Sequence, residues 1–143
     1  MGQIAASQDF SVSPEKVWET VTDLNTFESW LSLHQKWKSE LPASIAVGTK
    51  VTEVVSMMGM PNTITWNVDT LEEPKALSMS GEGMAGVKIT IAFTLTPNGE
   101  GTTLEMSTDF QGQMIVGALG KAIEKQGAVE VENSLAKLAE ILG

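Results

Sequence analysis

The feature that most constrains the fold is the hydrophobic period between Gly48 and Gln111, where apolar residues recur at every second position. Successive side chains of a strand point to opposite faces, so this pattern predicts half-buried antiparallel strands that are apolar on one face. Turn sequences separate the strands, and the clearest is Asn98-Gly99, because both residues tolerate positive φ. The repeating positions, one set to a predicted strand, are Val51, Glu53, Val55 and Met57; Ile64, Trp66 and Val68; Leu77 and Met79; Val87, Ile89, Ile91, Phe93 and Leu95; and Leu104, Met106, Thr108 and Phe110.

Before this region the sequence predicts one strand and two short helices. Residues 4–12 alternate partially and suit a first strand. Ser13 can cap a helix in which Pro14 takes the first position. A second short helix is expected over residues 25–37, with Glu28 completing a capping-box variant. One face of that helix would carry Phe27, Leu31 and His34, and the adjoining face Trp30, Leu33 and Trp37.

After Gly112 an apolar stripe with three- or four-residue spacing predicts one long amphipathic helix. A lone curved sheet must cover its apolar face, and this helix is the expected cover. Glycines within the helix lower its intrinsic propensity, but they allow a close approach to the sheet. The stripe consists of Ile115, Leu119, Ile123, Gly127, Val131, Leu135, Leu138 and Leu142. We therefore expect an α+β fold in a single domain over residues 1–143.

The composition excludes several classes of function. The chain has no cysteine, which removes disulfides, thiolate metal sites and cysteine nucleophiles. Its 9 basic and 18 acidic residues give a net charge of −9, which disfavours nucleic acid and anionic membranes as partners. No apolar run approaches the roughly 20 residues that span a bilayer, and no secretory signal is evident. We expect a cytoplasmic protein without integral membrane association.

Four segments carry a resemblance to a known superfamily. The segment "SPEKVWETVTDLNTFESWL", together with the order of the elements, resembles the START-like or SRPBCC superfamily, which includes polyketide cyclase/dehydrase-like and lipid-transfer proteins. The segments "WLSLHQKWKSELP" (30–42), "GMPNTITW" (59–66) and "GEGMAGVK" (81–88) resemble an actinobacterial subgroup within it. That subgroup is catalogued as toxins of type II toxin–antitoxin pairs.

The resemblance implies a helix-grip fold, in which a curved antiparallel sheet wraps around the long C-terminal helix and two short helices follow the first strand. It also implies a cavity for a hydrophobic ligand between the sheet and that helix. A fold of this kind hosts binders, carriers and enzymes, so it does not decide among them.

His34 and Glu53 are the candidates for proton transfer. His34 is the one histidine of the chain, and histidine can act as an acid or a base near neutral pH. Glu53 is in phase with the apolar positions of its strand, which predicts that it points inward; the alternative is a bulge or phase slip that turns it to solvent. A buried carboxylate is costly unless it is paired, and such a residue is often functional. A structural or ligand-contacting role for His34 is the alternative.

Aromatic and methionine side chains offer a large, adaptable apolar surface for a ligand. Most of them must form an ordinary core, but some are expected to line a cavity. The candidate ligand-binding residues are Trp30, His34, Glu53, Val55, Met57, Trp66, Met79, Phe93, Met106, Ile115, Leu119 and Ile123. A metal site is not expected, since few ligand-type side chains are grouped, and no cofactor is expected.

The glycines Gly81, Gly83 and Gly86 match the pattern G-x-G-x-x-G. A dinucleotide site needs a helix after this motif, whereas "VKITIAFTL" predicts a strand. We interpret the motif as a connection between strands, which could border the mouth of a cavity.

Three functions remain open at this point. The first is the binding of a small hydrophobic or aromatic molecule between sheet and helix. The second is a cyclase/dehydratase-like enzyme in which His34 or Glu53 moves a proton. The third is a toxin-like regulator that acts through an antitoxin-like protein partner. The sequence favours a binding protein over an enzyme, and it leaves monomer and homodimer open.

Overall fold

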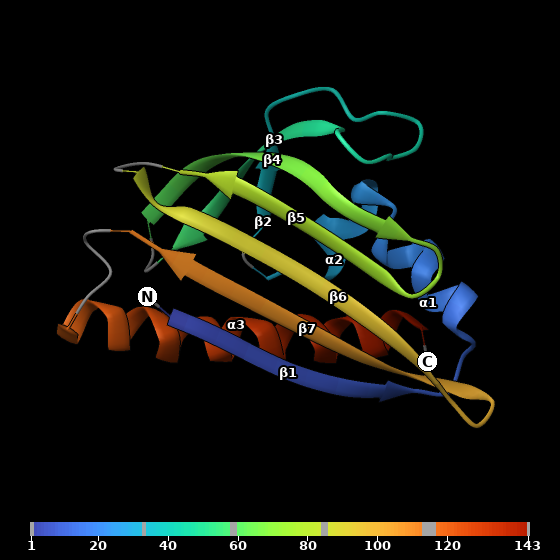
Figure 1. Ribbon diagram of the computed structural model, residues 1–143. Helices are drawn as coiled ribbons and strands as arrows, with labels where there is room; N and C mark the ends of the chain where they lie inside the picture. Colours follow the sequence, from blue (N-terminus) through green and yellow to red (C-terminus); the bar gives the residue numbers. More distant parts are fainter. Residues whose placement is uncertain (1, 33, 58–59, 84–85, 113–116, 143) are drawn as a thin grey trace.

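The computed structural model describes residues 2–32, 34–57, 60–83, 86–112 and 117–142 of the chain. In these ranges seven strands form one antiparallel sheet in the order β1-β7-β6-β5-β4-β3-β2 (Figure 1). The strands are β1 (Gly2–Phe10), β2 (His34–Trp37), β3 (Lys50–Met57), β4 (Met60–Glu72), β5 (Ala76–Glu82), β6 (Lys88–Asn98) and β7 (Gly101–Gln111).

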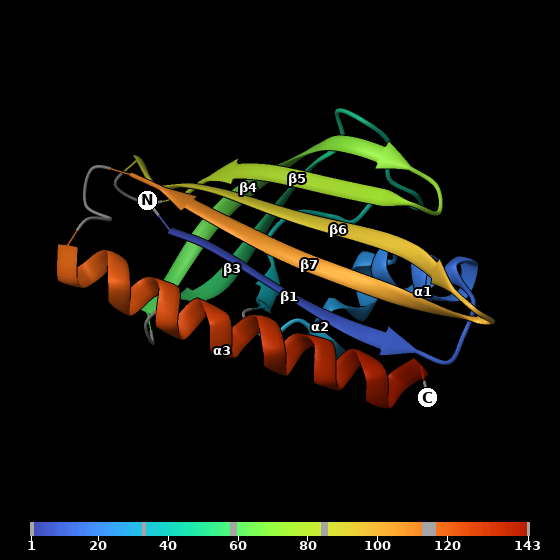
Figure 2. The same cartoon turned by 60° about the horizontal axis from the view of Figure 1, so that its bottom comes forward.

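The sheet curls, and the long C-terminal helix α3 (Gly117–Leu142) lies along it beside β1 (Figures 1 and 2). Two short helices, α1 (Pro14–Val21) and α2 (Phe27–Trp30), follow β1. The 3-10 turn η1 (Leu24–Thr26) lies between them. This arrangement confirms the predicted α+β class, the curved antiparallel sheet and its covering helix.

The two short helices begin differently from each other. At α1 the Ser13 Oγ accepts a hydrogen bond from the Lys16 N–H at 3.4 Å, so the predicted cap is present. Asn25 caps no helix, because the Asp23 Oδ1 accepts from the Asn25 N–H at 3.1 Å and caps η1 instead. The prediction of a capping box between Asn25 and Glu28 is therefore wrong.

The segment from Trp30 to Trp37 is not the single helix that its spacing predicted. Helix α2 ends at Trp30, because Leu31 turns to extended backbone with φ −77° and ψ 102°. The chain then forms β2, which pairs with β3 and places His34 opposite Val55. Pairing with β3 gives the backbone groups of β2 their hydrogen bonds, and this long-range gain outweighs a helical spacing that is only local.

The core lies on the inner face of the curled sheet. Alternation in β4 is typical, since Ile64, Trp66 and Val68 are buried while Thr65 is exposed. The same period holds in the described parts of β5, β6 and β7, as predicted. In β3 the predicted positions Val51, Glu53 and Val55 are buried, but Val54 between them is buried as well. Residues from α1 and α2 complete this core, namely Val17, Trp18, Val21, Phe27 and Trp30.

Helix α3 packs on the sheet through its predicted apolar stripe, in which Val131, Leu135 and Leu138 are buried. A Cβ added at Gly127 would lie 2.3 Å from the Ile4 Cδ1, so the absent side chain allows the helix to approach β1. The sequence anticipated this use of glycine.

Two glycines of the G-x-G-x-x-G motif serve close strand packing. A Cβ at Gly81 would lie 2.6 Å from the Thr65 carbonyl oxygen, and one at Gly83 would lie 2.7 Å from the Asn62 Oδ1. Strand β6 follows the motif, so the context that a dinucleotide site requires is missing.

Candidate functional site

The pairing of β2 with β3 brings His34 and Glu53 together inside the molecule. The His34 Nδ1 and the Glu53 Oε2 form a hydrogen bond. Their side chains are only 3% and 1% exposed. The inward orientation expected for Glu53 is therefore what the structure shows, and the two candidates for proton transfer are partners.

Trp66 on β4 is the second partner of Glu53. Its Nε1–H donates to the Glu53 Oε1 at 2.7 Å, so both carboxylate oxygens accept a hydrogen bond. A buried carboxylate without partners would be strongly destabilising, and these two donors offset that cost. We call His34, Glu53 and Trp66 the Glu53 cluster. The sequence placed Trp66 on the inner face but gave no signal for its bond to Glu53.

The Glu53 cluster has a defined chemical capacity. When the His34 Nδ1–H donates to the carboxylate, a neutral imidazole has its lone pair on Nε2. That nitrogen could accept a hydrogen bond or a proton, and Glu53 would stabilise the resulting imidazolium. The same relation between a carboxylate and a histidine orients general bases in many hydrolases.

Aromatic rings surround the imidazole of His34. The ring centroid of Trp37 lies 5.1 Å from it, and that of Phe27 lies 6.4 Å away in an edge-to-face arrangement. The ring centroid of Trp30 lies 5.1 Å from that of Phe27 and 5.9 Å from that of Phe93. Edge-to-face ring pairs add stabilisation to that from the apolar area they bury. These rings therefore hold the His34 imidazole in a well-packed apolar environment.

The remaining candidate ligand-binding residues lie on the same inner face, where they are tightly packed. Trp30, Trp66, Met79, Phe93 and Met106 are each 1% exposed. Val55 is also buried, and Ile123 of α3 is partly buried against this core. Ile115 lies outside the described residues, and the side chains of Met57 and Leu119 are not described. In this structure the described members contact one another as a core does.

Thr108 on β7 is a polar exception on this inner face. It follows the same alternation as Met106 and Phe110, and it is 2% exposed. Within the described part of the chain its Oγ1 has no hydrogen-bond partner. An unpaired buried hydroxyl costs about 1–3 kcal/mol, so Thr108 is an energetically unfavourable position in this apolar interior. The sequence placed Thr108 in the alternating inner-face set but not among the candidate ligand-binding residues.

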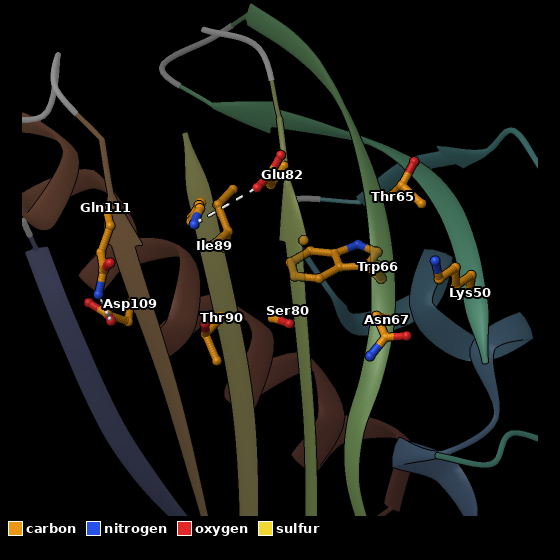
Figure 3. Close-up of a pocket in the computed structure, with 12 residues that line it drawn as sticks. Lys50, Thr65, Trp66, Asn67, Ser80, Glu82, Ile89, Thr90, Asp109 and Gln111 are labelled. Atoms are coloured by element: carbon orange, nitrogen blue, oxygen red, sulfur yellow. Dashed lines mark hydrogen bonds and ion pairs between the residues drawn. The ribbon is translucent and has the colours of Figure 1, made fainter. Parts of the chain in front are cut away.

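Two open hollows lined by described residues lie away from the space between the sheet and α3. The first, of about 440 Å³, crosses strands β3 to β7 and has a largely polar lining that includes Lys50, Glu82 and Asp109 (Figure 3). The second, of about 880 Å³, lies between α1, η1, residues 42–45 and the end of β4. The cavity between sheet and helix therefore stays a prediction.

Among the described residues no group of three or more His, Cys, Asp or Glu side chains is placed to hold a metal ion. In that same part of the chain, no helix is both long and apolar enough to cross a bilayer.

The curled seven-stranded sheet with α3 along it is a helix-grip fold, the class of fold that START-like proteins share. Within that class the chain belongs to the family described as "Polyketide cyclase / dehydrase and lipid transport", whose model matches residues 1–143. This confirms the resemblance inferred from the sequence.

Individual relatives extend the comparison. The chain is 33% identical to an uncharacterised protein of Mycobacterium tuberculosis over 143 residues, which is 100% of both chains. It is 28% identical over 135 residues to a protein of the same organism that is named as a toxin, covering 94% of each. A START superfamily protein from Mycobacterium smegmatis has the same fold, with a TM-score of 0.81, 15% identity, and coverage of 99% of this chain and 97% of that one.

Proposed function

We propose that this protein binds a small molecule with an apolar body and one polar end, in the space between the sheet and α3. The apolar body would contact the inner-face residues Trp66, Met79, Phe93 and Met106. A hydroxyl at the polar end would donate to the Nε2 of His34, whereas a carboxylate there would accept from the hydroxyl of Thr108.

The observation that carries this proposal is a small set of polar groups within an apolar interior. The Glu53 cluster and Thr108 lie on a sheet face whose other described side chains are mainly apolar. Ligand sites typically combine such a surface with a few polar groups that set orientation. Burial of about 200 Å² of apolar ligand surface would contribute roughly 5 kcal/mol. The family description, which includes lipid transport, supports the same conclusion.

Entry of a ligand requires the packed interior to open. Helix α3 is tied to the segment before β2, because the Ser32 N–H donates to the Ser134 Oγ at 3.0 Å. The Ser32 Oγ also donates to the Glu130 carbonyl oxygen at 3.0 Å. Met79 and Met106 can change conformation at low cost, since methionine is unbranched and flexible. Together these features support a site that forms as the ligand enters.

The test is to look for a carried ligand. Protein purified under native conditions would be analysed by native mass spectrometry before and after organic extraction. We expect an extractable molecule, and we expect ligand-free protein to bind palmitate, with a change in tryptophan fluorescence. The test variant Met106→Trp takes up the space that a ligand would need and should reduce binding, with circular dichroism to verify that the overpacked variant is folded. A ligand-free protein whose spectrum is unaffected by palmitate and by a set of aromatic polyketides would contradict the proposal.

A second candidate function is catalysis by His34. The hydrogen bond from its Nδ1 to Glu53 would orient the ring so that Nε2 can take a proton from a substrate carbon. Enolisation during a cyclase or dehydratase reaction requires such a step. The test is hydrogen–deuterium exchange of an acetoacetyl thioester, followed by NMR in heavy water. Exchange above the background that is lost in His34→Gln would support catalysis, whereas equal exchange in both proteins would oppose it.

A third candidate is a toxin-like regulator with a protein partner, in the cytoplasm. Its support is the relative named as a toxin. Induced expression should then arrest growth, and co-expression of a neighbouring gene product should relieve the arrest. Unimpaired growth would count against this function.

A further inference from the structure

The groove beside α1 is the larger of the two hollows, and it is separate from the interior site. It has a volume of about 880 Å³. Helix α1 and η1 form one wall and residues 42–45 form another. Leu71 at the end of β4 and Glu73 just after it close the groove. Three segments distant in sequence thus enclose one surface depression.

The groove carries charge of one sign only. Its lining includes the exposed carboxylates Glu15, Glu19, Asp23 and Glu73, and it includes no Lys, Arg or His. None of the four takes part in an ion pair within the described residues. Asp23 also caps η1 by accepting hydrogen bonds from Asn25, so the three glutamates are the carboxylates that can be replaced without removing a cap.

The floor of the groove is apolar. Trp18 and Leu24 are buried beneath it, and the half-buried Ile45 and Leu71 contribute their side chains. Two residues after Ile45 the same loop exposes Val47, which is 65% accessible to solvent. An apolar floor between acidic walls is suited to an aliphatic chain that ends in a positive charge, since lysine and arginine cover apolar surface with their stems.

We propose that this groove is a docking site for a basic amphipathic segment of a partner protein, with Lys or Arg on the carboxylates and an apolar side chain on the floor. Charge of one sign in a cleft concentrates its field and attracts the opposite charge. Nucleic acid and anionic membranes are repelled by the same charge. A small organic cation would satisfy the carboxylates, but it would leave the apolar floor exposed. The proposal does not depend on a ligand between the sheet and α3.

The experiment is titration calorimetry of the full chain with short synthetic peptides. The probe is an acetylated and amidated peptide of alternating Lys and Leu. The comparisons are the same peptide with Ser in place of Leu, the same peptide with Glu in place of Lys, and spermine. We expect the Lys/Leu peptide to bind, and the Lys/Ser peptide and spermine to bind more weakly. The peptide with Glu in place of Lys should not bind.

Two matched variants test the location. The first removes the groove charges by Glu15→Gln, Glu19→Gln and Glu73→Gln. The control removes three exposed carboxylates elsewhere, by Glu105→Gln, Glu132→Gln and Glu140→Gln. We expect the groove variant to weaken the Lys/Leu peptide about tenfold, because each exposed charge pair contributes modestly. The control variant should bind as the wild type does. Circular dichroism would verify that both variants are folded.

Several outcomes would overturn the proposal. Equal weakening in both variants would mean attraction to net charge alone. Equal affinity for the Lys/Leu and Lys/Ser peptides would remove the role of the apolar floor, and spermine binding as tightly as the Lys/Leu peptide would indicate a small-cation site instead. Absence of Lys/Leu binding at low salt would reject the docking site altogether. None of these results bears on palmitate binding, so the two proposals stand or fall separately.

Discussion

The His34 imidazole and the Glu53 carboxylate are hydrogen-bonded across the β2–β3 pair, in a part of the interior that solvent hardly reaches. Trp66 completes the arrangement from the next strand by donating to the other carboxylate oxygen. The carboxylate is thus held from the strands on both sides of β3, so the stability of the sheet depends on it.

Replacement of Glu53 by Ala should destabilise the protein by about 3–5 kcal/mol, because it leaves the ring nitrogens of His34 and Trp66 without an acceptor. Urea unfolding would measure the loss. Glu105→Ala, at an exposed position of β7, serves as the control and should change stability by less than about 0.5 kcal/mol. A Glu53→Ala protein as stable as the wild type would show that the carboxylate is not paired in solution.

Trp66→Phe should cost about 1–3 kcal/mol, since it keeps an aromatic ring but removes the N–H that Glu53 Oε1 accepts. A double-mutant cycle with Glu53→Ala, which removes the acceptor, separates this bond from the general effect of a smaller ring. We expect a coupling energy of about 0.5–3 kcal/mol, the usual range for two residues joined by a hydrogen bond. Simple additivity of the two substitutions would indicate that the bond contributes nothing.

Thr108→Val exchanges the unpartnered hydroxyl for a methyl group of similar shape. Because no hydrogen bond to a described residue is lost, the ligand-free protein should be as stable as the wild type, or more stable by up to about 1 kcal/mol. Binding of a ligand with a polar end should weaken in this variant. Matched thermal melts and palmitate titrations would show both effects. A marked destabilisation would mean that Thr108 already has a partner.

Gly127→Ala should lower stability by about 1–3 kcal/mol, although alanine favours helix, because the new Cβ meets the Ile4 Cδ1. Ile4→Val removes that Cδ1, so the double variant should recover part of the loss. Chemical denaturation of the two single variants and the double variant provides the comparison. If Ile4→Val fails to relieve the effect, the contact between α3 and β1 is looser than the structure shows.

Local patterns predicted most of the sheet correctly, because the alternation of Ile64, Thr65 and Trp66 depends only on neighbours in sequence. The same phase argument placed Glu53 inside. Strand β2 was missed for the opposite reason. Its four residues have helical spacing, and what makes them a strand is the free edge of β3, which lies many residues further along the chain.

The candidate site was predictable in part for a related reason. Sequence phase identified His34 and Glu53 as possible partners, but the bond from Trp66 depends on the exact register of β3 and β4, which the sequence does not reveal. Whether inner-face residues such as Phe93 and Met106 pack together or surround a space depends on volumes summed over the whole interior. No periodicity carries that information.

Ser134→Ala should loosen the attachment of α3 and thereby speed ligand entry. Ser134 is buried, and its Oγ accepts from the Ser32 N–H while donating to the Glu130 carbonyl oxygen at 2.8 Å. Removal of the hydroxyl leaves the Ser32 amide unpartnered, so we expect a loss of about 1–2 kcal/mol and faster amide exchange in α3. The association rate of palmitate should rise, in stopped-flow tryptophan fluorescence, while Ser29→Ala, at an exposed position of α2, should leave it unchanged. A slower or unaltered rate in Ser134→Ala would mean that the ligand enters without separating α3 from the segment before β2.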